Sequence, residues 1–585
     1  MAKSRIESSW QAATMKSRYH AYNDMNQQII ECVPNFSEGQ DDAIIQAIAR
    51  AIESVDGVKL LDVDAGKSTN RTVYTFAGKP DDVVEAAFQA AKVGSDLIDM
   101  SKHTGEHPRF GALDVCPLVP IANISMEETA GHARRLAERL GNELGLSIYL
   151  YANAATSPER QDLSMVRSGE YEGLSEKLKS PEWAPDFGPS VLNAKSGASA
   201  VGARDILIAY NVNLNTTSVR RANSVAFDVR ERGRLKRTGD PITGEIVKDD
   251  EGASVYEPGA LKSVRAIGWF IEEYGFAQVS MNLTDIRATP IHVAFDETCN
   301  KAWTRGIRVT GSELIGLIPL SSMLEAGRFF LQKQQRSTGV SDSELIRIAI
   351  KSMGLDELSP FKPEEKIIEY AIRDKTKKRL VDLSVKGFVE ETASESPAPG
   401  GGSIAATMGA MGASLATMVA NLSSHKRGWD DRWQEFSEWA DKGKAYQDKL
   451  IRLIDEDTDA FNDLMSAFSL PKSNDNEKTS RAMAIQSATK VAILIPLEVM
   501  QTSLDSMSVI KAMAEIGNPN SVSDAGVGAV AARSAVLGAH LNVKINCTSI
   551  KDHEWKQKTL ERASDIEAQA IALEAEILSI VEPKL

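Results

Sequence analysis

The spacing of hydrophobic and polar positions divides the chain into two stretches of alternating strands and helices and one long helical stretch. In the first stretch, short apolar runs of strand length alternate with segments whose apolar residues recur every three or four positions. This pattern predicts strands at 29–36, 58–64, 71–77, 113–120 and 146–152, and helices at 41–54, 81–98 and 126–144. The order approximates β-α-β-β-α-β, with one more helix and strand.

A similar order returns after residue 204, so the chain predicts two like α+β subdomains, at 29–204 and 205–350. The charged residues 233–258, which include Gly and Pro, are expected to form a surface insertion. We expect a ligand-binding cleft between the subdomains, with the loop 184–203 beside it. In the second subdomain the pattern predicts strands at 205–214, 262–273, 276–285 and 306–319, and helices at 216–232 and 290–305.

The strand pattern disappears after about residue 321. Residues 322–372 are charged and helical in pattern, and a helical linker is expected at 351–378. From 379 to 585 the periodicity predicts an all-α helical bundle. Its expected helices lie at 380–393, 403–424, 427–467, 476–505, 507–516, 522–545 and 551–581.

The stretch Ser396–Ser424 contains no charged side chain and is longer than the ~20 residues that a membrane-spanning helix needs. It is nevertheless rich in Gly, Ala, Ser and Thr, and its larger residues recur every three or four positions. This spacing favours a closely packed, buried helix of a soluble bundle. We therefore expect no membrane insertion.

Composition narrows the possible partners and compartment. A chain of 585 residues is too long for one hydrophobic core, and its net charge of −14 argues against nucleic acid as a partner. Residues 1–28 are expected to be an N-terminal extension, because they lack the apolar core of a secretory signal. The cysteines are far apart and form no CxxC pair, which favours a reducing cytoplasm. They are Cys32, Cys116, Cys299 and Cys547.

The first candidate for chemistry is the segment Lys102–Gly111, which holds two imidazoles, a carboxylate and two cations. Gly105 and Pro108 break helical continuity, and loops of this kind often carry functional side chains. Histidine, with an unperturbed pKa of about 6.5, can both give and take a proton near neutrality. We therefore expect His107 to be the general acid/base of a transfer reaction.

Two other readings of this segment stay open. The letters His103-x-x-Glu106-His107 match the H-x-x-E-H pattern of some zinc peptidases. That pattern requires a helix and a further ligand, and Gly105 and Pro108 disfavour the helix, so we expect no metal site. Alternatively, both histidines serve only in hydrogen bonds within the loop.

Two further features of the first subdomain are candidates for substrate binding. Asp64 ends one predicted strand and Arg71 begins the next, so they could orient His107 or hold a substrate, or merely cap the strands. A later loop of small residues would allow close approach of a flat ligand, although flexibility explains its composition as well. It consists of Gly188, Pro189, Ser190, Val191, Leu192, Asn193, Ala194, Lys195, Ser196 and Gly197.

In the helical region, Gly400, Gly401 and Gly402 precede a predicted helix, and Ser403 is expected to be its N-cap. Backbone amides at this positive helix end would suit an anionic or carbonyl-bearing ligand. The spacing fits neither the Walker pattern nor GxGxxG, so neither a nucleotide nor a nicotinamide site is expected.

The segment Asp455–Phe461 carries four carboxylates in five positions. On a helix Asp455 and Asp459 share one face, whereas Asp457 points to a different face, which could be the inner one. Crowding and partial burial could raise one carboxyl pKa enough for a general acid. The alternative is a solvated acidic face.

Together these motifs resemble the bifunctional formimidoyltransferase-cyclodeaminase family, from about Ile29 to the C-terminus. The chain differs from the family pattern in its N-terminal extension and in a longer insertion at 233–258. The segments that carry the resemblance are Glu31–Gly39, Leu61–Gly66, Ser68–Phe76, Gly105–Arg109, Gly111–Pro117, Trp183–Pro189, Gln278–Leu283, Ala398–Ser403 and Asp455–Phe461.

The resemblance implies two folate-dependent reactions of histidine degradation. A formimidoyl group moves from N-formimidoyl-L-glutamate to N5 of tetrahydrofolate, and the product then closes to 5,10-methenyl-tetrahydrofolate and releases ammonia. The resemblance assigns transfer to His107, folate contacts to Gly188–Gly197, and cyclisation to Asp457 with Asp455 in reserve.

The resemblance further implies polyglutamylated tetrahydrofolate as co-substrate, with no metal or nicotinamide. It also implies a homo-oligomer, for which the small-residue helix 403–424 is a suitable helix–helix interface. Three alternatives remain: a monofunctional enzyme of the same family, a zinc hydrolase using His103, Glu106 and His107, and a non-catalytic scaffold.

Overall fold

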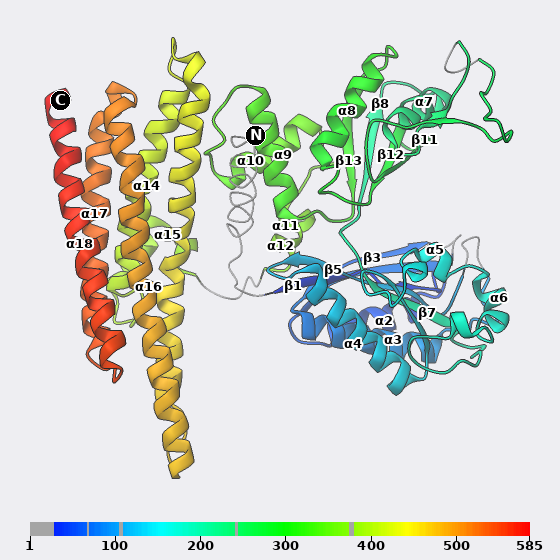
Figure 1. Cartoon of the computed structure of the whole chain (residues 1–585), viewed down its shortest axis with the longest axis horizontal. Helices are drawn as coiled ribbons and strands as arrows, with labels where there is room; N and C mark the ends of the chain where they lie inside the picture. Colours follow the sequence, from blue (N-terminus) through cyan, green and yellow to red (C-terminus); the bar gives the residue numbers. More distant parts are fainter. Residues whose placement is uncertain (1–27, 67–69, 105–108, 240–243, 374–378) are drawn as a thin grey trace. The chain divides into compact units, whose positions relative to one another are not determined.

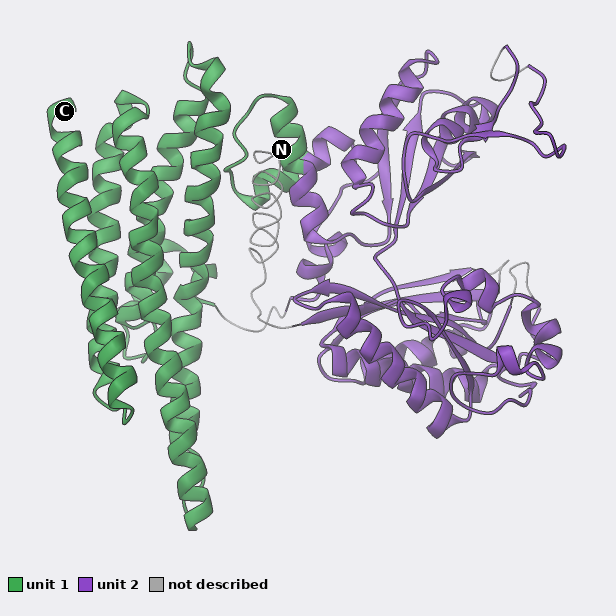
Figure 2. Cartoon of the chain, in the orientation of Figure 1, with its two compact units in different colours: residues 1–22, 327–348, 374–585 green, residues 23–326, 349–373 purple. Residues whose placement is uncertain are grey.

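The computed structural model describes residues 28–66, 70–104, 109–239, 244–373 and 379–585. These residues form two compact units (Figure 2). One contains the chain up to residue 326 together with 349–373, and the other contains 327–348 together with the chain from 379 onward. The subdomain predicted at 29–204 lies in the first unit, as does the one predicted at 205–350 except for residues 327–348, and the helical bundle forms most of the second unit.

The first subdomain is a seven-stranded mixed sheet with one face covered by helices (Figure 1). The helices α2 (Asp42–Glu53), α3 (Pro80–Leu97) and α4 (Met126–Leu144) bury their apolar stripes against it. The strands run in the order β3-β4, then β1 and β2, then β5-β7-β6. They are β1 (Ile29–Cys32), β2 (Asn35–Phe36), β3 (Val58–Gly66), β4 (Arg71–Gly78), β5 (Leu113–Ala122), β6 (Ser147–Ala152) and β7 (Ala198–Ala203).

Strand β7 corrects one expectation, because the sequence pattern treated 184–203 as a loop throughout. Its residues Ala198–Ala203 are fully buried and pair in parallel with β5 on one side and β6 on the other. The run Ala-Ser-Ala-Val-Gly-Ala has little intrinsic strand preference, so its central place in the sheet decides its structure. Between β6 and β7 lie the short helices η1 (Pro158–Arg160), α5 (Leu163–Val166), α6 (Glu170–Lys177) and η2 (Pro181–Trp183).

The second subdomain is a four-stranded antiparallel sheet in the order β11-β12-β8-β13. Helices α7 (Val219–Val229) and α8 (Ile291–Trp303) pack beside it (Figure 1). An apolar cluster that includes Ala77, Val119, Ile206 and Ile368 joins residues of the two subdomains. The cleft between them stays a prediction. The strands are β8 (Ile208–Leu214), β11 (Val264–Ile271), β12 (Phe276–Leu283) and β13 (Val309–Ile315).

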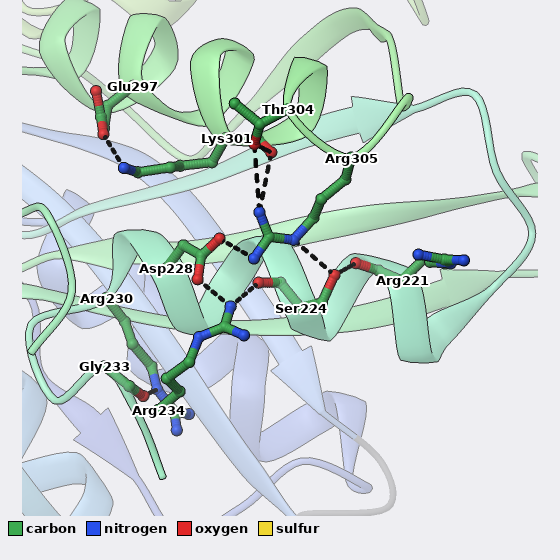
Figure 3. A network of polar contacts seen from close by, with 10 residues as sticks. All are labelled: Arg221, Ser224, Asp228, Arg230, Gly233, Arg234, Glu297, Lys301, Thr304 and Arg305. Carbon is green, nitrogen blue, oxygen red and sulfur yellow. Dashed lines mark hydrogen bonds and ion pairs between the residues drawn. The ribbon is translucent and has the colours of Figure 1, made fainter. Parts of the chain in front are cut away.

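The insertion at 233–258 contains an antiparallel pair, β9 (Arg234–Leu235) and β10 (Tyr256–Glu257). A polar network fixes its first strand (Figure 3). The Asp228 carboxylate of α7 accepts from the guanidinium groups of both Arg234 and Arg305. Arg305 also donates to the Ser224 hydroxyl at 3.2 Å. The insertion therefore begins from a fixed point on the subdomain.

Helix α9 (Leu320–Lys333) leads from the second subdomain into the bundle's unit, and α10 (Asp342–Met353) leads back to the first unit. Residues 327–348 pack in the bundle's unit, where the Thr338 hydroxyl donates to Asp441 at 2.8 Å and its backbone N–H donates to the Ser437 hydroxyl at 3.0 Å. The short helices α11 (Pro363–Lys366) and α12 (Ile368–Ala371) stay with the first unit.

The remaining chain is helical, as predicted, and Figure 1 shows its long helices packed side by side. The separate helices expected at 476–505 and 507–516 are one continuous helix, in which the residues around Ser506 are buried in the bundle. Pro496 also lies within this helix and does not end it. The helices are η3 (Leu380–Asp382), α13 (Val385–Thr392), α14 (Gly401–Ser424), η4 (Asp430–Arg432), α15 (Trp433–Phe468), α16 (Asp475–Ile516), η5 (Pro519–Ser521), α17 (Val522–Cys547), α18 (His553–Val581) and η6 (Glu582–Lys584).

Helices α14 and α16 are each long and apolar enough to cross a membrane by length and composition. In α14 this composition serves close packing: a Cβ added to Gly412 would lie 2.9 Å from the carbonyl oxygen of Gly528 on α17. The helix packs against α15, α16 and α17, and its small residues are buried as expected from the sequence. A core helix of a bundle passes the same test of length and composition.

Candidate active sites

The segment Lys102–Gly111, called the His107 segment below, is held by contacts on both sides of residues 105–108. His107, with Glu106, Gly105 and Pro108, lies outside the described residues. On the N-terminal flank, the Asn70 side chain donates to the carbonyl of Thr104 at 2.8 Å and accepts from the backbone N–H of Gly39 at 2.9 Å. Asn70 has a left-handed backbone (φ +49°) and begins the turn into β4. It therefore joins the His107 segment to the sheet.

His103 is part of the same anchor. Its imidazole is buried, and Nε2 lies 2.8 Å from the carbonyl oxygen of Asn70, to which it donates. This bond occupies Nε2, so the zinc reading would have to use Nδ1. Among the described residues there is no group of three or more His, Cys, Asp or Glu side chains placed to hold a metal ion. Glu106 and His107, the other members of that reading, are outside those residues.

Arg109 anchors the C-terminal flank. Its guanidinium donates to the carbonyl oxygens of Met100 (2.9 Å) and His103, so it joins the two flanks of the segment. The same group donates to Glu172 at 2.8 Å and lies 4.7 Å from the centre of the Tyr171 ring. The guanidinium is held on three sides, which fixes the chain immediately after Pro108.

The loop Gly188–Gly197 lies directly beside this segment. The N–H of Met100 donates to the carbonyl of Lys195 at 2.8 Å, and the N–H of Ala112 donates to the carbonyl of Ser196 at 2.8 Å. Gly111 and Gly197 form an antiparallel bridge, and a Cβ on Gly197 would lie 2.5 Å from the Phe110 carbonyl oxygen. The structure thus brings together two segments that the sequence singled out separately.

Both ends of the loop are fixed, while its middle is exposed. At its start, Gly188 (φ +81°) allows an approach in which a Cβ would lie 1.9 Å from the Leu146 carbonyl oxygen. At its end, the Asn193 side chain accepts from the N–H of Lys195 at 3.0 Å. Between them Val191 is 73% exposed, so the loop offers side chains and backbone to solvent next to the His107 segment.

Arg71 lies in a charged cluster that the sequence did not predict. Its guanidinium pairs with Asp114, a fully buried carboxylate on β5, and donates through Nε to the Asn35 side chain at 2.9 Å. Arg167, just after α5, donates to the same Asp114 oxygen at 2.9 Å. Burial lowers the pKa of Arg71, and Asp114 opposes that effect. The two guanidinium groups therefore share one carboxylate oxygen.

Asp64, the other predicted binding residue of this region, lies exposed on the edge strand β3. It is paired in register with Val73, which places it on the same sheet face as Arg71 two residues away. That face is opposite to the one covered by α2, α3 and α4. Sequence reasoning missed Asp114 and Arg167, because only the register of β5 and the return of the chain through α5 bring them to Arg71.

In the bundle, Asp457 of α15 faces the start of α14. Its carboxylate accepts from the Ser403 hydroxyl at 3.0 Å and also from the Ser403 backbone N–H. A Cβ on Gly402 would lie 2.1 Å from the Asp457 carboxylate, so only glycine allows this approach. The predicted inward direction of Asp457 is therefore correct, and its partner is the glycine run that the sequence singled out separately.

The expected role of Ser403 as N-cap is wrong, because α14 already begins at Gly401 and Gly400 occupies the cap. Ser403 is instead in the first turn, where its side chain reaches across to α15. The third contributor, Asn542 of α17, was not predicted: a Cβ on Gly401 would lie 3.1 Å from its amide nitrogen. Asn542 stands between Leu541 and Val543 and belongs to none of the motifs seen in the sequence.

Asp455 has a different contact from Asp457. Its carboxylate accepts from the backbone N–H of Leu380 at 2.8 Å and thereby holds the beginning of the bundle's chain. Burial raises the pKa of Asp457, while the two Ser403 hydrogen bonds oppose the rise. Burial likewise raises the pKa of Asp455, opposed by the Leu380 N–H. Asp457 therefore faces the N-terminal end of α14, whereas Asp455 holds the backbone of Leu380.

Comparisons with known proteins cover almost the whole chain. The family model of the formiminotransferase domain, N-terminal subdomain, matches residues 29–204, that of the formiminotransferase domain matches 209–373, and that of formiminotransferase-cyclodeaminase matches 384–565. The chain is 42% identical over 558 residues to the formimidoyltransferase-cyclodeaminase of Mus musculus, covering 95% of this chain and 99% of that protein.

Two shorter relatives match separate parts of the chain. The glutamate formimidoyltransferase of Streptococcus pyogenes serotype M1 is 40% identical over 305 residues, which are 52% of this chain and 94% of that protein. The methenyltetrahydrofolate cyclohydrolase of Methylorubrum extorquens is 34% identical over 202 residues, which are 34% of this chain and 97% of that protein.

Proposed function

Since the chain belongs to the formimidoyltransferase-cyclodeaminase family, we propose that it catalyses both of the reactions in that family's name. Its first unit transfers the formimidoyl group of N-formimidoyl-L-glutamate to N5 of tetrahydrofolate. Its helical bundle then cyclises 5-formimidoyl-tetrahydrofolate to 5,10-methenyl-tetrahydrofolate with release of ammonia. These are steps of histidine degradation, with polyglutamylated tetrahydrofolate as co-substrate.

The observation that best supports the transfer is the joining of the His107 segment to the Gly188–Gly197 loop by backbone hydrogen bonds. In the proposed reaction N5 attacks the formimidoyl carbon, and the bond from that carbon to the glutamate nitrogen breaks. His107 takes the proton from N5 and returns it to the departing glutamate nitrogen, which suits a group that titrates near neutrality.

We assign the carboxylates of N-formimidoyl-L-glutamate to the cluster of Arg71, Asp114 and Arg167. The cluster combines two guanidinium groups with one carboxylate, and all three side chains are largely buried. Arginine matches carboxylates in geometry as well as in charge, which supports this assignment.

For cyclisation, N10 attacks the amidine carbon, one proton passes from N10 to the amidine nitrogen, and a second proton completes the ammonia that leaves. We assign the supply of that second proton to Asp457. The rise of its pKa through burial supports this role, because a carboxyl must be protonated to act as an acid. Asp455 stays in reserve.

The test follows the two half-reactions separately in purified protein. We expect His107→Ala to reduce transfer by at least about a hundredfold while cyclisation of supplied 5-formimidoyl-tetrahydrofolate is retained, in line with typical contributions of a general acid/base. We expect Asp457→Asn to do the reverse. Folded wild-type protein that forms neither product would refute the proposal, and cyclisation retained by Asp457→Asn would move the role to Asp455.

We also propose a cytoplasmic homo-oligomer. The sulfur atoms of Cys32 and Cys116 lie 3.6 Å apart in a hydrogen bond and do not form a disulfide, which is consistent with a reducing compartment. Large apolar side chains are exposed on the neighbouring helices α14 and α17, among them Met411, Leu422 and Leu541. A second copy of the chain could cover them.

Light scattering tests the assembly, since an oligomer has a mass at least twice that of the 63.6 kDa chain. We expect Leu541→Lys to lower the assembled mass, because it places a charge on the apolar surface. An unchanged mass in Leu541→Lys would move the interface elsewhere, and a monomeric wild type would refute the assembly.

A further inference from the structure

The motif Trp183–Pro189, which the sequence singled out, has no part in the reactions proposed above. Its first residue, Trp183, presents its ring to the ammonium group of Lys177, which ends α6 and lies 4.0 Å from the ring centre. The ring centres of Tyr149 and Phe110 lie 5.9 Å and 6.0 Å from the same nitrogen. A cation within about 6 Å of an aromatic face is attracted by it, so three rings hold this ammonium group.

The ammonium group of Lys177 also binds the backbone on both sides of Arg167. It donates to the carbonyl oxygens of Val166 at 2.6 Å, Met165 at 3.1 Å and Ser168 at 3.2 Å. Helix α5 has only four residues, which are too few to be stable alone, and carbonyl groups at a helix end need partners from outside. Lys177 supplies such a partner and places a positive charge at the negative end of the helix.

Arg167 connects this turn to the proposed substrate site. It follows α5 directly, and its backbone N–H donates to the carbonyl of Leu163 at 3.0 Å, so its main chain belongs to the turn that Lys177 holds. Its guanidinium donates to Asp114 at 2.9 Å, in the cluster to which we assign the carboxylates of N-formimidoyl-L-glutamate. The place of this guanidinium therefore depends on a main chain that Lys177 fixes.

A buried ion pair fixes the backbone around Trp183. Arg160 pairs with Asp186 at 2.6 Å, and both side chains are almost fully buried. The same guanidinium donates to the carbonyl oxygens of Glu182 at 3.0 Å and Ala184 at 2.8 Å, the residues on either side of Trp183. The aromatic surface against which Lys177 lies is therefore held in place by contacts of its own.

We propose that Lys177 is a positioning residue for the binding of N-formimidoyl-L-glutamate, because it holds the backbone from which Arg167 reaches Asp114. The inference rests on the proposed transferase function and adds a residue that acts on this substrate through Arg167. Without the ammonium group, the turn after α5 would lose the bonds that close it, and the guanidinium of Arg167 would be less well placed for a substrate carboxylate. Binding of tetrahydrofolate does not depend on this turn.

The charge of Lys177 makes this support depend on pH. Burial, and after it the charge of Arg160 on η1, lowers the pKa of Lys177 to about 8. The other charged or titratable groups around it are Asp186 after η2, which pairs with Arg160, Arg167 after α5, and the Tyr149 hydroxyl on β6. Burial raises the pKa of Tyr149 to about 12, so this hydroxyl keeps its proton near pH 8. As pH rises through about 8, Lys177 loses its charge, and its bonds to the turn weaken.

The experiment measures the KM of transfer for each substrate at pH 7, with the other substrate held saturating. Lys177→Met keeps the length of the side chain and removes its charge and its donors. It should raise the KM for N-formimidoyl-L-glutamate about tenfold, the scale of losing one hydrogen bond to a charged group. The KM for tetrahydrofolate should be unchanged. The kcat should also be retained, because ground-state and transition-state binding weaken together.

The pH dependence separates positioning from a general effect on structure. In the wild type the KM for N-formimidoyl-L-glutamate should rise between pH 7 and pH 9, as Lys177 loses its proton. In Lys177→Met the same KM should be high at both pH values. Lys177→Arg, whose guanidinium stays charged at pH 9, should restore part of the binding and remove the rise.

Two further variants complete the test. Lys179→Met makes the same change two positions along the chain, at a side chain that is 67% exposed and pairs with Glu176, and it should leave both KM values unchanged. Trp183→Leu removes the aromatic face beside Lys177 and should raise the KM for N-formimidoyl-L-glutamate about twofold to fivefold, as expected for a cation–π contact. It takes the place of Lys177→Met if the melting profile shows that Lys177→Met does not fold.

The outcomes distinguish the inference from the function on which it rests. An active wild type whose KM for N-formimidoyl-L-glutamate is unchanged in the folded variant, or whose two KM values rise equally, would overturn the inference. A rise with pH that persists in Lys177→Met would overturn it as well. A wild type without transfer activity would overturn the proposed function, and the inference with it.

Discussion

Single residues at the helix end of α14 set the acidity of the proposed cyclisation site. Burial raises the pKa of Asp457, and two hydrogen bonds from Ser403 hold it back. Gly402 is the residue that permits the contact, because any Cβ would overlap the carboxylate. The sequence predicted Asp457 and the glycine run as separate candidates; only the packing of α14 on α15 shows that they are one site.

This balance predicts the pH dependence of cyclisation. If Asp457 acts as the acid, the rate falls as pH rises through its pKa, because the protonated form disappears. Ser403→Ala removes a hydrogen bond that favours the charged form, so it should raise the pKa and move the falling limb of the pH profile to higher pH. The rate of cyclisation measured from pH 5 to pH 9 in wild type and Ser403→Ala checks this. A limb that moves to lower pH would contradict the assignment.

At the scale of elements, the loops of the first subdomain are placed by residues that contact no reacting atom. Asn70, in the turn before β4, donates to the carbonyl of Thr104 in the His107 segment and accepts from the N–H of Gly39. The main strands and helices of both subdomains and their repeated order were predictable, because apolar periodicity determines them. Strand β7 was not, since burial rather than residue preference makes Ala198–Ala203 a strand.

The anchor at Asn70 can be removed without touching the proposed acid/base. Asn70→Ala loses both side-chain hydrogen bonds and strains a left-handed backbone position. We expect transfer to fall about tenfold to a hundredfold, because misplacement of a catalytic group by about 1 Å has that effect. Cyclisation by the same protein serves as the internal control and should be unchanged. Full transfer activity in Asn70→Ala would show that the loop is held by other contacts.

At the scale of the whole molecule, buried charge connects distant parts of the first unit. Glu31 on β1 is buried and Glu369 on α12 is partly buried, and desolvation raises the pKa of each to about 7. Arg204 opposes the rise at Glu31, and Glu369 adds to it. The interaction of Glu31 with Glu369 could not be predicted from the sequence. The two residues are more than three hundred positions apart, and they approach each other only because α12 packs near the sheet.

The pair predicts a loss of stability with rising pH. A carboxyl whose folded pKa is about 7 binds its proton between pH 4.5 and pH 7 while the unfolded chain does not, so the free energy of unfolding falls across that range. The loss is on the order of 3 kcal/mol for one such carboxyl. Glu369→Gln keeps an acceptor for the Leu320 N–H and should flatten the dependence. Denaturant titrations at pH 5 and pH 8 test this, because they give the free energy of unfolding at each pH. An equal fall in that free energy between the two pH values in wild type and Glu369→Gln would contradict the prediction.

The division of the chain into units also governs the order in which it can fold during synthesis. Residues 327–348 leave the ribosome with the first unit, yet their partners belong to the second. Ser437 follows Thr338 by 99 residues, which at about 5–20 residues per second is a delay of about 5–20 s. Throughout that interval Thr338 and Gly339 have neither Ser437 nor Ala440 to pack against. The nascent first unit can therefore be complete before this segment has its partners.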